Sequence, residues 1–157
     1  MKILLPVDGS ANALAAVQHA LRLVRAGLKA DFVLVNVQEP ASLYEMVVAH
    51  DAEVIEQVRS AAGADLLAPA EALLTAAGVD WESEVAGGSP TQVLLDLIEQ
   101  YGCDMVVLGT QGASSLRNAL LGSVSQALLQ HSPVPVTVVR LADRAEAAEI
   151  ADADIAD

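Results

Sequence analysis

Short apolar runs alternate with longer amphipathic stretches along most of the chain. Nearly continuous apolar runs predict four strands of a parallel sheet covered on both faces, at residues 3–7, 32–37, 104–108 and 134–139. Residues 80–86 instead alternate polar and apolar side chains, which predicts a strand with one wet face near a sheet edge. We therefore expect five strands.

Two helices are expected before the strand with the wet face. One begins at an N-cap Ser10 and ends near Gly27, because apolar side chains between them recur at helical spacing. The other covers about 44–77. It should break or kink between Gly63 and Pro69, because proline has no amide hydrogen to donate and clashes with the preceding turn.

Two more helices flank the fourth strand. Ser89 followed by Pro90 predicts a helix start, with Gln92 placed to complete a capping box. The last helix is expected over 123–131. Five strands alternating with helices predict a single α/β domain, an open twisted parallel sheet with right-handed crossovers and helices on both faces.

Composition and charge narrow the functional classes. With 157 residues, 54% of them hydrophobic, the chain is long enough for one domain with a sizeable core. A formal net charge of -13 with eight Lys and Arg argues against a nucleic acid partner. No apolar run approaches the roughly 20 residues of a membrane-spanning helix, and the N-terminus lacks a signal peptide's apolar region. We expect a cytoplasmic protein without membrane insertion.

The last residues differ in composition from the rest. Residues 142–157 are rich in alanine and acidic side chains, with only Ile150 and Ile155 to bury. Such a segment has too little apolar surface to offset its ordering entropy. We expect a disordered tail after a domain spanning 1–141, with a docking helix as the alternative.

Three glycines follow the fourth strand at distinctive spacing. Gly109, Gly112 and Gly122 are followed directly by Ser123. Backbone amides in a glycine-rich turn form an anion-binding concavity, and a helix N-terminus adds unpaired donors. This segment therefore indicates a site for a nucleotide's phosphates, to which Ser123 and the nearby Ser125 could donate hydrogen bonds.

Other interpretations of this segment were weighed. Gly109 could merely end a strand, and residues 123–126 (SVSQ) form a capping box by themselves. Arg117 is the only basic residue in the loop, so backbone donors, with a divalent cation such as Mg²⁺, would have to neutralise the phosphates. Neither GxGxxG nor GxxxxGK[ST] occurs, which disfavours an NAD-type site and a P-loop.

Over about residues 2–140 the chain resembles the universal stress protein family. Its ATP-binding members carry G-x2-G-x9-G-[ST] between the fourth strand and the fourth helix, and that spacing is intact here. The stretches PVDGS, VNVQEP, GGSP and HSPVPVTVV are similar to the family's landmarks. The resemblance implies a Rossmann-like domain with strand order 3-2-1-4-5 that binds ATP, or ADP or AMP, with or without Mg²⁺.

The resemblance also implies which residues bind. Adenine would lie near Pro6, Val7, Asp8 and Val37, with Asp8 bonded to the adenosine. The phosphates would be wrapped by Gly109, Gly112, Gly122, Ser123, Val124 and Ser125. Gln111 and Ala113 stand where ATP-binding relatives often have basic or bulky residues, which predicts triphosphate affinity reduced or shifted towards AMP or ADP.

Three functions were weighed. The first is an ATP-binding regulatory stress protein, in which nucleotide between the first and fourth strands stabilises a signalling-competent dimer read by a regulatory protein. The second is a slow ATPase or nucleotidyl-transfer enzyme, with Glu45, His50 and Asp51 as the only candidate bases in the segment after residue 40. The third is a nucleotide-free dimeric scaffold. The sequence contains no group of residues typical of a catalytic site and no metal-ligand spacing, so no dedicated catalysis is expected.

A homodimer is expected in all three cases. The last strand, Val134 to Val139, is apolar on both faces and would leave an aggregation-prone edge unless something covered it. Pairing with the same strand of a second chain is the simplest cover.

Overall fold

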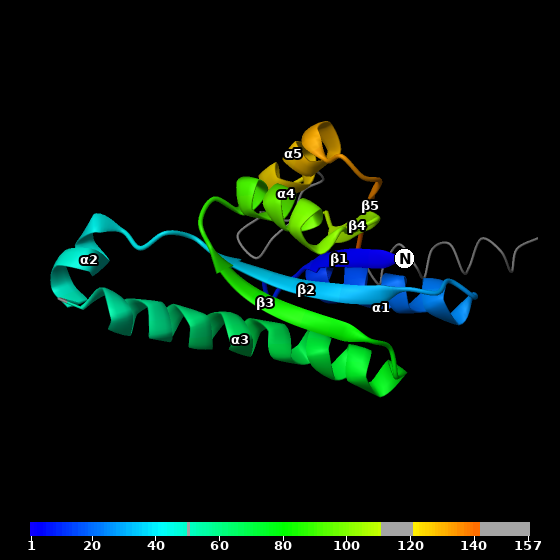
Figure 1. The fold of residues 1–157 in the computed structure, drawn as a ribbon, viewed down its shortest axis with the longest axis horizontal. Coiled ribbons are helices and arrows are strands. Elements are labelled where there is room, and N and C mark those ends of the chain that lie inside the picture. The colour runs from blue at the N-terminus through cyan, green and yellow to red at the C-terminus, as the bar shows by residue number, and fades with distance from the viewer. Residues whose placement is uncertain (50, 111–120, 142–157) are drawn as a thin grey trace, which may run out of the picture.

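The computed structural model of the protein describes residues 1–49, 51–110 and 121–141. Its centre is a five-stranded parallel sheet in the order β3-β2-β1-β4-β5 (Figure 1). The strands are β1 (Lys2–Pro6), β2 (Asp31–Gln38), β3 (Trp81–Gly87), β4 (Met105–Gly109) and β5 (Val136–Val139). The predicted fold class and strand order are confirmed.

Helices cover both faces of the sheet. α1 (Ala11–Arg25) and α3 (Ala52–Ala77) pack on one face, and α4 (Pro90–Tyr101) and α5 (Ser123–His131) pack on the other (Figure 1). The short helix α2 (Leu43–Ala49) precedes α3 and packs against it. The sheet is therefore the middle layer of three.

The central strands are buried on both sides. Because successive residues of a strand point to opposite faces, β1 sends Ile3 and Leu5 into the core beside α1 and α3 and Leu4 into the core beside α4 and α5. All three side chains are fully buried. This double burial explains why the strand is apolar almost throughout, as the sequence predicted.

The long helix α3 differs from its prediction. The predicted break between Gly63 and Pro69 is wrong, because α3 continues through Pro69 as one helix of 26 residues. Its buried face, which includes Leu67 and Leu74, packs on the sheet and offsets the backbone bond that proline removes. The interruption falls earlier, at Asp51, whose carboxylate accepts a hydrogen bond from the Glu53 amide and caps α3.

The start of α4 also differs from the prediction. Ser89 is its N-cap and Pro90 its first residue, as expected, but the Ser89 side chain makes no capping hydrogen bond. Gln92 Nε2 instead donates to Asp96 Oδ1 at 2.9 Å, one turn along the helix. The predicted capping box is therefore not formed.

The two edges of the sheet are β3 and β5. β3 is an edge strand, as its alternating pattern predicted, with Glu82 and Ser83 exposed. β5 begins at Val136, two residues later than predicted, because Pro135 has no amide to donate to a neighbouring strand.

Among the residues that the structure describes, no helix is long and apolar enough to cross a membrane. The predicted acidic tail, 142–157, lies outside the described residues.

Candidate functional site

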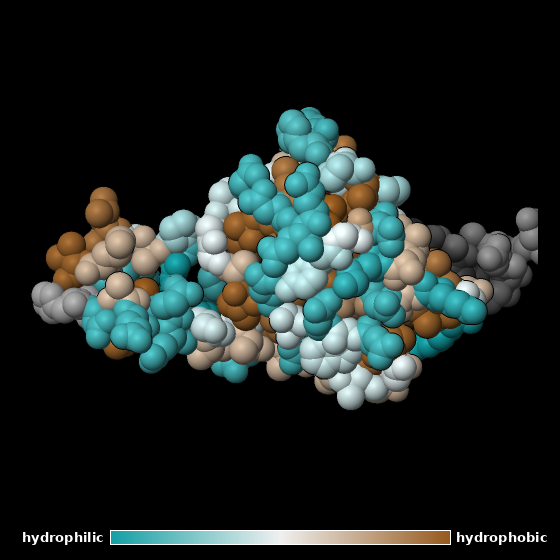
Figure 2. All heavy atoms as spheres, in the orientation of Figure 1, coloured by the Kyte–Doolittle hydropathy of each residue, from teal (hydrophilic) through white to brown (hydrophobic). Residues whose placement is uncertain are grey.

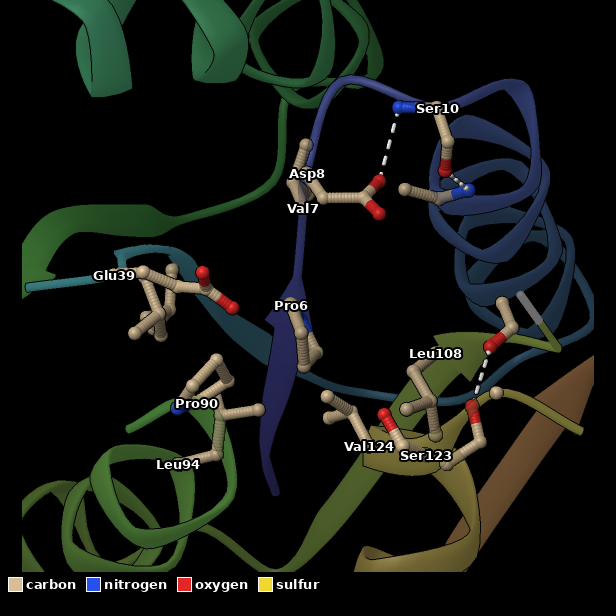
Figure 3. A pocket seen from close by; sticks show the side chains of 16 residues that line it. Pro6, Val7, Asp8, Ser10, Glu39, Pro90, Leu94, Leu108, Ser123 and Val124 are labelled. Atoms are coloured by element: carbon tan, nitrogen blue, oxygen red, sulfur yellow. Dashed lines mark hydrogen bonds between the residues drawn. The ribbon is translucent and has the colours of Figure 1, made fainter. Parts of the chain in front are cut away.

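A pocket of about 390 Å³ opens at the carboxyl edge of the sheet, where β1 and β4 end. Ligand pockets in proteins usually enclose about 300–1,000 Å³, so a small organic molecule fits. Its lining comes from the loops after β1, β2 and β4 and from the starts of α4 and α5 (Figure 3). The lining residues are Pro6, Val7, Asp8, Ser10, Ala13, Val35, Val37, Glu39, Pro90, Leu94, Leu108, Gly109, Gly122, Ser123, Val124 and Ser125.

Nearly all predicted binding positions meet here. Nine of them line this one pocket: Pro6, Val7, Asp8, Val37, Gly109, Gly122, Ser123, Val124 and Ser125. Gly112, and with it Gln111, Ala113 and Arg117, lies outside the described residues. The two segments that the sequence singled out, more than 100 residues apart, are thus brought together by the pairing of β1 with β4.

One side of the pocket is an apolar slot. Pro6 and Val37 lie at the ends of neighbouring strands, and Leu94 of α4 and Val124 of α5 flank them (Figure 3). Val35, Leu94 and Leu108 are buried, so the slot continues the hydrophobic core up to the mouth of the pocket. A flat, weakly polar ring would replace water there at little desolvation cost.

The turn after β1 holds a carboxylate at the pocket. Asp8 Oδ1 accepts a hydrogen bond from the Ser10 amide at 2.9 Å, and Ser10 Oγ accepts one from the Ala13 amide at 3.1 Å, which caps α1. Ahead of them, the Val7 carbonyl accepts a hydrogen bond from the buried Asn36 Nδ2 at 2.8 Å. The backbone that carries Asp8 is therefore fixed on both sides.

The opposite side of the pocket is the N-terminus of α5. Gly122 is its N-cap, in an extended conformation, and its amide donates to the Thr110 carbonyl at 2.7 Å. The capping box weighed for residues 123–126 is not formed, since Ser123 is already inside the helix and exposed. Like every helix start, this one has first-turn amides without intrahelical acceptors. They are available to an anion.

Two of the predicted phosphate-binding residues also have a role in packing. The Ser125 hydroxyl donates to the Gly109 carbonyl at 2.9 Å, which ties α5 to the end of β4. A Cβ at Gly109 would lie 2.7 Å from the backbone carbon and oxygen of Asn12 in α1. The missing side chain at 109 therefore lets α1 and β4 approach closely, a reason different from the predicted approach to phosphate.

The charge of the pocket is negative. Asp8 and Glu39 are the ionisable groups that line it, and no lining residue in the described part of the chain is basic. Within residues 1–49, 51–110 and 121–141 no group of His, Cys, Asp and Glu side chains is arranged to hold a metal ion.

Comparison with known proteins identifies the family. The model of the universal stress protein family matches residues 1–140. The chain belongs to this family. A putative universal stress protein of Staphylococcus haemolyticus is 32% identical over 140 residues, which cover 88% of this chain and 83% of the relative.

Solved structures share the fold of this universal stress protein. A universal stress protein in complex with cAMP aligns with a TM-score of 0.61 and 24% identity, over 89% of this chain and 96% of that one. An Arabidopsis thaliana member with AMP bound aligns with a TM-score of 0.63 and 19% identity, over 90% of this chain and 92% of that one.

Sequence reasoning about this universal stress protein missed seven lining residues: Ser10, Ala13, Val35, Glu39, Pro90, Leu94 and Leu108. Glu39 could have been found, because it follows β2 as Asp8 follows β1, at the same edge of the sheet. Leu94 could not, because its helical spacing marks only a core position.

The candidate bases after residue 40 do not line the pocket. Glu45 accepts hydrogen bonds from the Ser42 amide at 2.7 Å and the Ser42 hydroxyl at 3.0 Å, and these hold the pKa of Glu45 below its usual range. Asp51 caps α3. His50 lies outside the described residues. In the described part of this universal stress protein, neither carboxylate is placed for catalysis at the pocket.

Proposed function

We propose that the pocket binds an adenine nucleotide and that the protein acts as a nucleotide-dependent regulatory stress protein of the cytoplasm. The observation that carries this proposal is that one pocket is lined by apolar side chains, by a carboxylate fixed in a turn and by a helix N-terminus. The base, ribose and phosphate of a nucleotide match these three kinds of lining. Related proteins solved with cAMP and with AMP bound support it.

The adenine would occupy the slot between Pro6, Val37 and Leu94. Asp8, an acceptor held at the mouth of the slot, would take a hydrogen bond from a ribose hydroxyl or from the base. Glu39 projects towards the same space from the end of β2 (Figure 3). Two carboxylates on this side would repel phosphates and so favour the orientation with phosphates towards α5.

The phosphates would lie beside Gly122 at the start of α5, where the amides of Ser123 and Val124 meet the positive end of the helix dipole. Because the described lining carries no basic residue, charge on the nucleotide is costly here. We therefore propose that AMP or ADP is preferred to free ATP and that Mg²⁺ enters as the counter-ion of the di- or triphosphate.

Replacing Gly122 tests this function. The Gly122→Val side chain would project at the phosphate end of the pocket and should weaken AMP binding by about tenfold or more, equivalent to at least about 1.4 kcal/mol. The measurement is calorimetric titration of AMP, ADP and ATP, each with and without Mg²⁺, into protein stripped of ligand.

The matched control is Gly87→Val at the end of β3. A Cβ there has only the Gln38 carbonyl oxygen nearby, at 4.0 Å, and Gly87 does not line the pocket. Both variants should retain the parent's circular dichroism. Equal AMP affinity in the parent and Gly122→Val, or no binding to the parent, would reject the proposed site.

We further propose that the protein is a homodimer through β5 and that a regulatory protein reads the nucleotide-bound dimer. β5 pairs only with β4 and forms one edge of the sheet. Its residues Val136–Val139 are all half-buried, so a second copy of the strand could complete their burial.

A charge in β5 should break this dimer. Val138→Lys is expected to lose this contact and so to halve the mass of the parent, or to give insoluble protein, because a buried ammonium without a partner is costly at the centre of the interface. Size-exclusion chromatography with light scattering measures the mass. Leu129→Lys is the control, since Leu129 is 49% exposed on α5, outside the strand. A soluble Val138→Lys variant with the same mass as the parent would refute this interface.

A further inference from the structure

Among residues 1–49, 51–110 and 121–141, most of the exposed large apolar side chains lie on the segment that follows β2. Helix α2 and the beginning of α3 project beyond the sheet as an arm (Figure 1). Seven large apolar side chains on this arm are between 49% and 82% exposed: Leu43, Tyr44, Met46, Val47, Val48, Val54 and Val58. The space-filling view shows hydrophobic side chains gathered at the same end of the molecule (Figure 2). We refer to these seven residues as the apolar arm.

The arm is helical, and several of its polar side chains form hydrogen bonds within the arm. Ser42 and Glu45 bond to one another through both side chains and both amides, which forms a capping box at the start of α2. Arg59 of α3 attracts the Glu45 carboxylate, and Asp51 caps α3. These polar groups are used at the starts of α2 and α3, and the seven apolar side chains are left exposed.

The exposed area equals that of an interface. Seven side chains of this size at these exposures present about 800 Å², which is the area that each partner contributes to a stable protein–protein contact. Exposed apolar area of this extent within one segment is rare on monomeric proteins, even where polar side chains such as Glu45 and Glu53 interrupt it. We therefore expect the arm to be covered by another apolar surface.

The charge of the arm selects the kind of partner. Amphipathic helices that lie on membranes carry many Lys and Arg, whereas residues 43–62 contain four acidic side chains and one basic side chain, Arg59. With a net charge of -13, an anionic lipid surface would repel the chain. None of the seven apolar residues is charged, but Glu45, Asp51, Glu53 and Glu56 are exposed around them, so a second copy must keep these carboxylates at the rim of the contact.

We propose that the apolar arm is an interface between two copies of this chain, related by a two-fold axis. Each copy supplies the same uncharged patch, so one contact covers both surfaces. The arm adjoins β2 and β3, on which α3 packs, whereas β5 forms the opposite edge of the sheet. The contact is independent of nucleotide binding and compatible with a dimer through β5. If both contacts exist and their two-fold axes cross at right angles, they close a tetramer.

The mass of the protein in solution tests the arm. Val47→Glu combined with Val58→Glu should halve the mass of the parent in sedimentation velocity, because four carboxylates would be buried at the contact. The control, Gln57→Glu, adds a charge at an exposed polar position next to Val58 and should leave the mass unchanged. Circular dichroism checks the fold of each variant.

Combination with Val138→Lys separates this interface from the one at β5. If both exist, the arm variant and Val138→Lys are each dimers, and the triple variant is a monomer. If the β5 interface is absent, the parent is a dimer and the arm variant alone is a monomer. A parent that is monomeric, or a folded arm variant with the mass of the parent, would overturn the proposal.

Cross-linking supplies a test that leaves the arm apolar. Val58→Cys introduces an exposed thiol on the arm. The native Cys103 is buried, so a bismaleimide would react with the introduced thiol and cross-link two copies through it. Cross-linked dimers are expected, and their absence at a fully modified thiol would overturn the proposal. Flotation of the parent with phosphatidylcholine vesicles, lost in the Val47→Glu, Val58→Glu variant, would assign the arm to lipid and also overturn it.

Discussion

Gly109→Ala is expected to lower the free energy of unfolding by about 3 kcal/mol, near the upper end of what overpacking a core costs. The added Cβ would lie 2.7 Å from the Asn12 backbone carbon and oxygen, and backbone atoms at the start of a helix cannot rotate away. Either α1 or β4 must shift. Because Ser125 bonds to the Gly109 carbonyl, the start of α5 would shift with it. Urea denaturation followed by circular dichroism measures the change.

Gly87→Ala is the matched control for Gly109→Ala. Gly87, like Gly109, is the last residue of its strand, at the carboxyl end of the sheet. A Cβ at Gly87 would have only the Gln38 carbonyl oxygen nearby, at 4.0 Å. We expect a change in unfolding free energy of less than about 0.5 kcal/mol, as for an ordinary surface substitution. If both variants lose the same stability, the close approach of α1 to β4 is not the reason for the glycine.

Gly63→Ala should destabilise the protein, although alanine is the better helix former by about 1 kcal/mol. Gly63 is buried in the middle of α3, and a Cβ there would overlap the Val85 side chain and lie 3.0 Å from Asn36 Oδ1. Val85 has little rotamer freedom on its strand. Asn36 in turn holds the Val7 carbonyl, so the strain would reach the turn that carries Asp8.

The test is whether Gly63→Ala raises or lowers the free energy of unfolding. Ala64→Gly, at the exposed neighbouring position of α3, should lower the free energy of unfolding by about 1 kcal/mol through helix propensity alone. Opposite substitutions at adjacent positions would then both destabilise. A Gly63→Ala variant that is more stable than the parent in thermal and urea denaturation would contradict the packing of α3 on β2 and β3.

The apolar pattern was enough to predict the sheet. A strand such as β1 is buried on both faces, so an apolar side chain is expected at nearly every position of its sequence. Because β1 and β4 pair in parallel, their carboxyl ends lie side by side, and Asp8 and Gly122, which the resemblance implied as binding residues, line one pocket.

What the sequence could not predict depends on contacts between distant elements. The reason for Gly109 lies in Asn12, and the reason for Gly63 lies in Val85 and Asn36. A glycine shows only that a side chain is absent, and the neighbour that requires its absence is set by tertiary packing. The continuity of α3 through Pro69 has the same origin, since burial of one helix face outweighs a local preference to break.

The site of nucleotide binding is tested most directly by amide chemical shifts. Protein labelled with ¹⁵N and stripped of ligand would be titrated with AMP and followed residue by residue. We expect the largest shifts at Val7 to Ser10 and at Gly122 to Ser125, with those of the apolar arm unchanged. A separate cavity between α1 and α3 is lined by Arg22 and Leu73 among others. Shifts confined to that cavity, or no shifts at all, would contradict the account.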